Sequence, residues 1–244
     1  MGITAAKCQA PILMHMEYKV RLPDHDWVVG RGHKFTPSVY AGIIIEKDNI
    51  GKKEAVSHSG PTCIAISSGK HSSSTASTHA VDLEKVIESE DFKPITKGSD
   101  GKTKPVMIVS VDGGPDENPR YIKVILHAIE TFLKNNLDGL FIFTNAPGRS
   151  AFNKVERRMA PLSKALSGVI LPHDHYGTHL DNNGKTIDDD LELKNFKYAG
   201  EALAQIWSEL KIDSYNVAAE FIFSDEVVPD PKPCTDHKWY ANQK

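Results

Sequence analysis

The stretch "VMIVSVDGGPDENP" (residues 106–119) decides the fold expected for this chain. Its first residues form an apolar run, which predicts a buried strand over 106–112. Asp112 closes the run, two glycines allow a sharp turn, and Asp116–Pro119 are typical of a helix start. Sheets with flanking helices bind ligands where their strands end. Asp112 is therefore a candidate site residue, with turn capping as the alternative.

The rest of the chain predicts an α/β protein in which helices flank a mixed sheet. Residues 1–16 are expected to form no strand, and residues 22–37 a polar loop around a short apolar piece. Thr186 is the expected cap of the last helix. The remaining strands are predicted over 17–22, 38–46, 62–68 and 139–144, and the helices over 72–89, 119–136, 150–168 and 186–211. Within the second of these helices, Ile122, Ile125, Leu126, Ile129 and Leu133 form the expected apolar stripe.

Length and composition narrow the class of protein. A chain of 244 residues suits one large domain. We expect a core over 1–211 and a C-terminal extension over 212–244, loose from Pro229 onward. The net charge of −3 offers no general basic excess for a polyanion partner, although local patches can serve.

Cysteine use and hydropathy bear on the compartment. The three cysteines, Cys8, Cys63 and Cys234, are far apart and form no CxxC pair, which favours a reducing compartment. The longest apolar run, around Val39–Ile45, is too short to span a bilayer, and the N-terminus lacks signal-peptide features. We expect a nuclear or cytoplasmic protein that is not secreted and has no membrane partner.

The helix over 150–168 carries the second candidate. Ser150 is its expected N-cap, and Glu156 lies at the border of its buried face. This carboxylate needs a partner, which is either a neighbouring arginine or a metal ion. With Asp112 it would supply oxygen ligands for Mg²⁺ or Mn²⁺. The apolar positions, spaced 3, 4, 3 and 4 residues apart, are Phe152, Val155, Met159, Leu162 and Leu166.

The segment "LPHDHYGTHLD" (171–181) offers a different metal site. His173, His175 and His179 are possible zinc ligands, although their spacing is not one of the stronger zinc patterns. A solvated or hydrogen-bonded loop is the alternative.

Two segments resemble the second and third acidic motifs of DDE-type transposases, which belong to the RNase H-like superfamily. The segments are "VDGGPDENPR" and "APGRSAFNKVERRMAPLS", and the resemblance extends over about residues 2–210. It implies an RNase H-like sheet with Asp112 as the second catalytic acid and Glu156 as the third. The matching residues are Asp112, Gly113, Gly114, Asn118, Pro147, Gly148, Ser150, Asn153, Val155, Glu156 and Arg158.

The resemblance also implies a ligand and a partner. Mg²⁺ or Mn²⁺ would be held by the acids, and the partner would be double-stranded DNA at transposon ends, bound by a possible homo-oligomer. Asn153 would position backbone or phosphate near the helix. Lys154, Arg157 and Arg158 would meet the DNA backbone, with ordinary solvation of the helix surface as the alternative.

One element of the family pattern differs in this chain. In such proteins the first catalytic aspartate lies on the first strand, just upstream of the segment matching "GITAAK" (2–7). Here no acid precedes Glu17, and Asp24 and Asp26 belong to a later loop. We therefore expect a transposase core that lacks its first strand and whose present catalysis is doubtful. A non-catalytic DNA-binding or structural remnant, and a zinc protein using His173–His179, are the alternatives.

Overall fold

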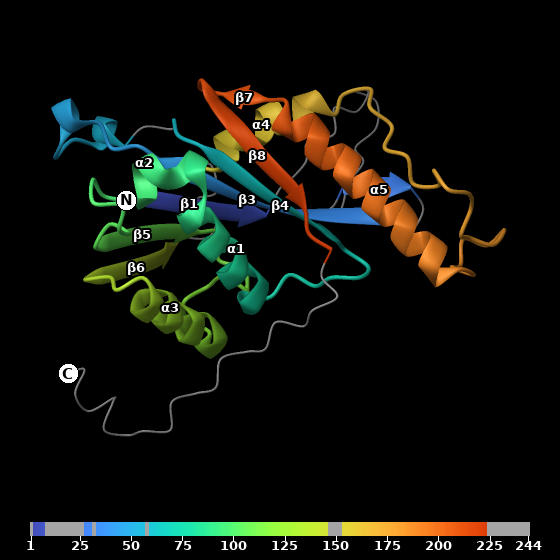
Figure 1. Cartoon of the computed structure of the whole chain (residues 1–244), viewed down its shortest axis with the longest axis horizontal. Coiled ribbons are helices and arrows are strands. Elements are labelled where there is room, and N and C mark those ends of the chain that lie inside the picture. The colour runs from blue at the N-terminus through green and yellow to red at the C-terminus, as the bar shows by residue number, and fades with distance from the viewer. Residues whose placement is uncertain (1, 8–26, 31–32, 57–58, 146–152, 224–244) are drawn as a thin grey trace.

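The computed structural model describes residues 2–7, 27–30, 33–56, 59–145 and 153–223, and within them an eight-stranded sheet with helices on both faces (Figure 1). The strand order is β6-β5-β1-β3-β4-β8-β7, and β2 pairs with β3 outside this path. The strands are β1 (Gly2–Lys7), β2 (Trp27–Gly30), β3 (His33–Ile43), β4 (Thr62–Ser68), β5 (Val106–Val111), β6 (Gly139–Thr144), β7 (Lys211–Ile212) and β8 (Tyr215–Phe221). The helices are α1 (Ala76–Glu88), α2 (Lys93–Thr96), α3 (Ile122–Lys134), α4 (Glu156–Ala165) and α5 (Asp189–Ser208), with 3₁₀ turns η1 (Lys47–Asn49), η2 (Lys53–Ala55) and η3 (Glu90–Phe92).

The sheet is mixed, as the sequence predicts. Strands β1, β3 and β4 pair antiparallel, whereas β5 and β6 continue the sheet parallel to β1. On the other side β8 runs parallel to β4. The α/β class and the strands over 62–68 and 139–144 are therefore confirmed.

The centre of the sheet corrects one prediction. Residues 1–16 were expected to contain no strand, yet β1 lies between β3 and β5 and pairs with both. Its sequence, GITAAK, has little strand propensity of its own. Neighbouring strands on both sides offer backbone donors and acceptors, so pairing partners rather than local preference decide its conformation. The predicted strand over 17–22 lies outside the described residues.

Strand β3 begins at His33, earlier than the predicted residue 38, and it contains Pro37. Proline cannot donate to a sheet ladder and normally marks a strand boundary. Here β2 pairs with β3 only as far as Phe35, and β1 pairs with it only from Ser38. Pro37 lies in the gap between them and is tolerated, so part of the predicted 22–37 loop is strand.

Alternating residues of β3 and β4 face two separate cores. Val39 and Ala41 point into the core beneath α4 and α5, whereas Tyr40 points toward α1. Successive strand residues face opposite sides, so a sheet covered on both faces buries nearly every position. The core under α4 and α5 contains Phe35, Val39, Ile64, Ile66, Val155, Met159, Leu162, Phe196, Leu203 and Trp207. The core under α1 and α3 contains Ile87, Met107, Val109, Val111 and Leu137.

Helices α4 and α5 form the layer that carries Glu156. The indole N–H of Trp207 donates to the carbonyl of Leu162 at 3.1 Å, which joins the two helices inside the core. Val155, Met159 and Leu162 are buried, so the predicted apolar face is confirmed over its described part. The described helix begins at Glu156, and Ser150 and Phe152 lie outside the described residues.

Three local predictions differ from the structure. Asp188, not Thr186, caps α5, because its carboxylate accepts the Leu191 N–H at 2.9 Å. The predicted stripe of α3 is partly exposed, with Ile122 at 62%, because α3 lies beside the edge strand β6 and only one flank is covered. Strand β8 (215–221) lies in the predicted extension, pairs with β4 through residues 217–221 and so belongs to the sheet.

None of the described helices combines the length and the apolar character that a membrane span requires.

Replacing Gly200 with alanine tests the contact between α5 and β8. An added Cβ would lie 2.2 Å from Cδ2 of Phe221. Alanine ordinarily stabilises a helix by about 1 kcal/mol relative to glycine. Here we expect the opposite: Gly200→Ala should lower the free energy of unfolding by about 1–3 kcal/mol through overpacking. Urea unfolding followed by circular dichroism measures this. Lys197→Ala on the exposed side of α5 is the control, and a G200A protein as stable as wild type would contradict the packing described.

Candidate active site

Asp112 lies immediately after β5, at the start of a tight turn. Gly113 has φ of 93° and packs against Thr144 at the end of β6, where an added Cβ would lie 3.4 Å from the threonine Cβ. The N–H groups of Glu117 and Asn118 both donate to the carbonyl of Gly114, at 3.1 and 2.8 Å. The half-buried Asp112 is thus positioned at the edge where β5 and β6 end.

Glu156 is the first residue of α4 and is also half-buried. Burial raises the pKa of its carboxyl group, and the negative charge of Asp112 raises it further. An ion pair with Arg157 or Arg158 would lower that pKa, so the arginine-pair alternative is not supported. The two acids, far apart in the sequence, therefore lie near enough to repel each other.

Two further acids, Asp116 and Glu117, come from the same turn as Asp112. Glu117 is only 6% exposed, and burial raises the pKa of its carboxyl group to about 7, opposed by His79 and assisted by Asp116 and Asp112. Sequence analysis interpreted both residues as helix-start residues. No sequence spacing marks them as site residues, because their burial depends on α1.

His79 of α1 contacts both of these acids. Its Nε2 lies 3.3 Å from Oδ2 of Asp116 and 3.7 Å from Oε1 of Glu117. Burial opposes the charged imidazolium, but the hydrogen bond to Asp116 and the negative charge of Glu117 outweigh it, so the pKa of His79 is raised. His79 is a site residue that the sequence analysis did not identify.

A cavity of about 70 Å³ adjoins this cluster beneath α1 and α3. Its walls are mostly apolar, and its polar lining residues are Tyr40, His79, Asp116, Glu117, His127 and Thr131. Oε1 of Glu117 is buried and has no hydrogen-bond partner among the described residues. A cavity of this size with polar groups in its lining has room for ordered water.

The residues predicted to contact DNA differ in exposure. Arg157 is exposed, and Lys154 is half-buried and donates to the Val56 carbonyl at 3.1 Å. Asn153 is buried, and its Oδ1 accepts the Val155 N–H at 3.5 Å. Arg158 is 1% exposed and pairs with Asp213 at 3.4 Å. Because their side chains are buried, Arg158 and Asn153 support α4 from inside the protein rather than present a surface to DNA.

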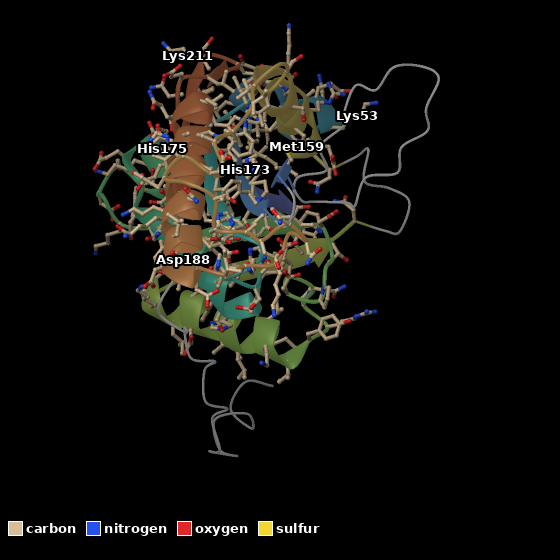
Figure 2. All side chains as sticks on the ribbon, turned by 90° about the vertical axis from the view of Figure 1, so that its right-hand side faces the viewer. Lys53, Met159, His173, His175, Asp188 and Lys211 are labelled. Carbon is tan, nitrogen blue, oxygen red and sulfur yellow. The ribbon has the colours of Figure 1, made fainter. Side chains whose placement is uncertain are left out.

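The histidine loop does not bring its three imidazoles to one point. The ring of His175 stacks on Tyr198 of α5 at 3.8 Å and lies beside that helix in Figure 2. His179 is buried, and its Nδ1 lies 3.0 Å from the Asn195 amide nitrogen. His173 is half-buried. The structure favours the hydrogen-bonded loop over the zinc site.

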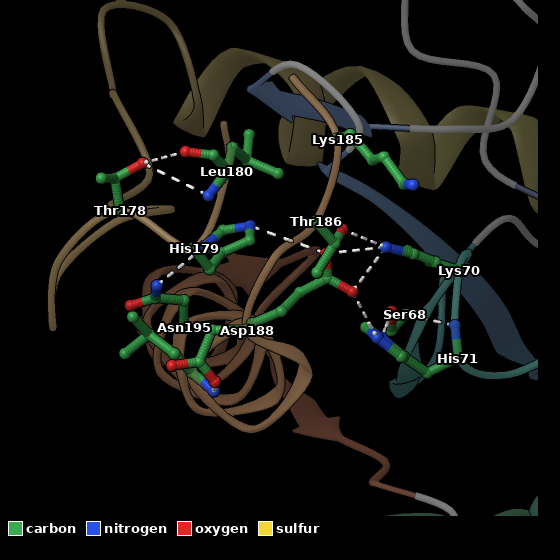
Figure 3. Close-up of polar contacts among 12 residues, drawn as sticks. Ser68, Lys70, His71, Thr178, His179, Leu180, Lys185, Thr186, Asp188 and Asn195 are labelled. Atoms are coloured by element: carbon green, nitrogen blue, oxygen red, sulfur yellow. Dashed lines mark hydrogen bonds and ion pairs between the residues drawn. The ribbon is translucent and has the colours of Figure 1, made fainter. Parts of the chain in front are cut away.

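Glu192 of α5 is the centre of the polar network that this loop joins. Its partners Lys70, His71, Thr186 and His179 are labelled in Figure 3. Its carboxylate accepts hydrogen bonds from Lys70 at 2.7 Å and from Thr186, and it lies 2.9 Å from Nε2 of His71. Burial alone would raise the pKa of Glu192, but these contacts lower it. The network joins the end of β4 to α5, and no sequence motif predicted it.

Within the described residues, no group of three or more histidine, cysteine or acidic side chains is arranged to hold a metal ion. Asp112 and Glu156 form a pair and not a triad. Comparison with protein-family models, with curated proteins and with solved structures finds no match to the chain. The interpretation of the site therefore rests on its own residues.

The raised pKa of Glu117 predicts how stability depends on pH. Between pH 4.5 and about 7 the folded protein binds more protons at this carboxyl group than the unfolded chain does. The contribution of this group to the free energy of unfolding therefore falls by about 3 kcal/mol as pH rises through that window. We expect Glu117→Gln to remove that loss, as measured by urea unfolding at a series of pH values.

The exposed Glu201→Gln on α5 is the control for this series. A Glu117→Gln protein with the same pH dependence as wild type would show that Glu117 is not buried as described.

Removing the Glu192 carboxylate tests the second network. Glu192→Ala leaves the ammonium group of Lys70 and the ring of His71 without this acceptor. We expect the free energy of unfolding to fall by about 2–4 kcal/mol. Glu201→Ala, on the same helix but exposed, should change it by less than about 0.5 kcal/mol. Equal effects of the two substitutions in thermal and urea unfolding would contradict a stabilising role for the network.

Proposed function

We propose that this chain is a DDE transposase-like core that holds a divalent cation between Asp112 and Glu156 and contacts DNA phosphates beside it. The observation that carries the proposal is the position of two half-buried acids from distant segments, Asp112 after β5 and Glu156 at the start of α4, near enough that the charge of Asp112 raises the pKa of Glu156. Acids from distant segments are rarely brought together without a use, because their repulsion costs stability unless a cation offsets it.

The arrangement of elements supports the same proposal. Asp112 follows a parallel strand of a mixed sheet, and Glu156 begins a helix of the layer that packs on the sheet. This agrees with what the resemblance to RNase H-like transposases implies for the second and third acids. The resemblance implies the first acid just upstream of the segment that forms β1, the strand next to β5, and β1 itself contains no acid.

The residues present fit a hard cation with incomplete protein ligation. Carboxylate oxygens are the ligands that Mg²⁺ and Mn²⁺ prefer, and Mg²⁺ commonly uses one or two carboxylates together with water and substrate phosphate. When bound, such an ion would polarise a phosphodiester and acidify water. Asp112 and Glu156 would hold it, and the half-buried position of both side chains would leave one side open to substrate.

Of the described residues predicted to contact DNA, Arg157 is best placed to orient it at this site. It is exposed and lies next to Glu156 at the start of α4. An arginine side chain can donate two parallel hydrogen bonds to a phosphate. Lys154 adds positive charge. Burial lowers the pKa of Lys154, and the nearby charge of Arg157 lowers it further. Together they would attract the backbone of double-stranded DNA.

A second candidate is a DNA-binding protein without cleavage activity. It is favoured by the absence of acidic residues from β1 and by the pair of acids where the resemblance implies three. Charge count sets the affinity of such sites, so a site with two acids should bind its cation less tightly than one with three. Both candidates share Arg157 and differ in what happens to the phosphodiester.

Substitution of the acids distinguishes these outcomes. We expect Mn²⁺ binding, measured by electron paramagnetic resonance, to weaken at least about tenfold in Asp112→Asn and in Glu156→Gln, because each removes a ligand charge. Mn²⁺-dependent nicking of plasmid DNA should disappear in both. Asp138→Asn, at the opposite end of the parallel strands, is the control.

Unchanged Mn²⁺ binding in both substituted proteins would overturn the proposed cation site. Salt-sensitive DNA binding without nicking in the wild-type protein would select the second candidate.

A further inference from the structure

We infer that His79 is a positioning residue, which joins α1 to the turn that carries Asp112 through the side chains of Asp116 and Glu117. The inference deepens the proposed function, since Asp112 matters most if it ligates a cation. Its structural part concerns the turn alone and can be tested without any metal.

The Nε2 side of the imidazole faces the turn. This nitrogen lies 3.3 Å from Asp116, 3.7 Å from Glu117 and 3.0 Å from the hydroxyl of Ser74. The Ser74 hydroxyl in turn donates to Asp116 at 2.6 Å. Two consecutive acids of the turn are therefore held by groups at the start of α1.

The Nδ1 side of the ring faces the core. It lies 2.9 Å from the hydroxyl of Tyr40, a residue of β3 that is only 2% exposed. That hydroxyl donates to Asp82 at 3.1 Å, so its oxygen is available to accept a hydrogen bond from Nδ1 of His79. An imidazolium that donates from both nitrogens cannot rotate without losing contacts at one of them. The raised pKa of His79 agrees with this doubly donating form.

The last step runs from Glu117 to Asp112. The N–H groups of Glu117 and Asn118 donate to the Gly114 carbonyl, and the Asn118 amide donates to the Gly113 carbonyl at 3.4 Å. The segment that His79 holds is thus tied by hydrogen bonds to the two glycines that follow Asp112, the residue that would bind the cation. Residues behind a ligand set its orientation in metal sites generally, and their loss weakens affinity.

The charges of the neighbouring acids explain why an imidazolium, and not a neutral side chain, suits the position of His79. Without the imidazolium, Asp116 and Glu117 would face each other and the nearby Asp112 in a poorly solvated place. Mutual repulsion would then displace the turn. The positive charge of His79 would offset this repulsion and leave Asp112 and Glu156 as the carboxylates that would hold the metal ion.

The test compares His79→Gln with His127→Gln in the full chain. His127 is a buried histidine of α3 that lines the same cavity, and its Nε2 lies 3.0 Å from the Ser77 hydroxyl. Two readouts are used, amide hydrogen exchange at Asp112 and the affinity for Mn²⁺. We expect His79→Gln to speed the exchange of that amide and to weaken Mn²⁺ binding by about tenfold. His127→Gln should lower stability and change neither readout.

Wild-type exchange at Asp112 in a folded His79→Gln protein would overturn the inference, as would equal changes in both variants. If wild-type protein binds no Mn²⁺, the proposed function fails while the exchange measurement still decides the role of His79. If His79→Gln does not fold, Tyr40→Phe removes the Nδ1 contact together with the hydrogen bond to Asp82 and leaves the Nε2 contacts of His79 in place. It should then speed exchange at Asp112 to a smaller extent, and unchanged exchange would overturn the inference.

Discussion

Four carboxyl groups gather where β5 ends, and their mutual repulsion constrains the structure around them. Asp112, Asp116 and Glu117 belong to one turn, and Glu156 approaches from α4. Acids in a partly desolvated place either bind a proton, accept hydrogen bonds or face a cation. This cluster uses all three means: burial raises the pKa of Glu117 to about 7, Asp116 accepts a hydrogen bond from Ser74, and His79, whose pKa is raised, lies beside both acids.

The layer of α4 and α5 determines where the fourth acid lies. Trp207 joins the two helices, and Arg158 pairs with Asp213 at the turn between β7 and β8. That turn has positive φ at Asp213 and Ser214, as expected of a two-residue hairpin of type I′. Glu192 joins the other end of this layer to β4 through Lys70 and His71. The site therefore depends on contacts that begin far from it.

Of the candidate site, the sequence predicted the residues that belong to motifs. Asp112 could be proposed because an acid follows an apolar strand and precedes two glycines, and Glu156 because it borders a helical stripe. His79, Glu117 and Glu192 could not be proposed from the sequence. The pKa of each depends on burial and on contacts with residues far away in the chain. For the same reason Arg158, charged and expected at the surface, is a buried residue of the interior.

By itself the sequence determined the α/β class, the strands with continuous apolar runs and the helices whose apolar residues recur every three or four positions. Periodicity and turn residues act over short distances, and they are visible in one chain. Only the tertiary structure decided that GITAAK is a central strand, that residues 215–221 extend the sheet and that α3 leaves part of its stripe exposed. Each of these depends on which backbone edges and side-chain surfaces remain to be covered, and that is set by the assembled fold.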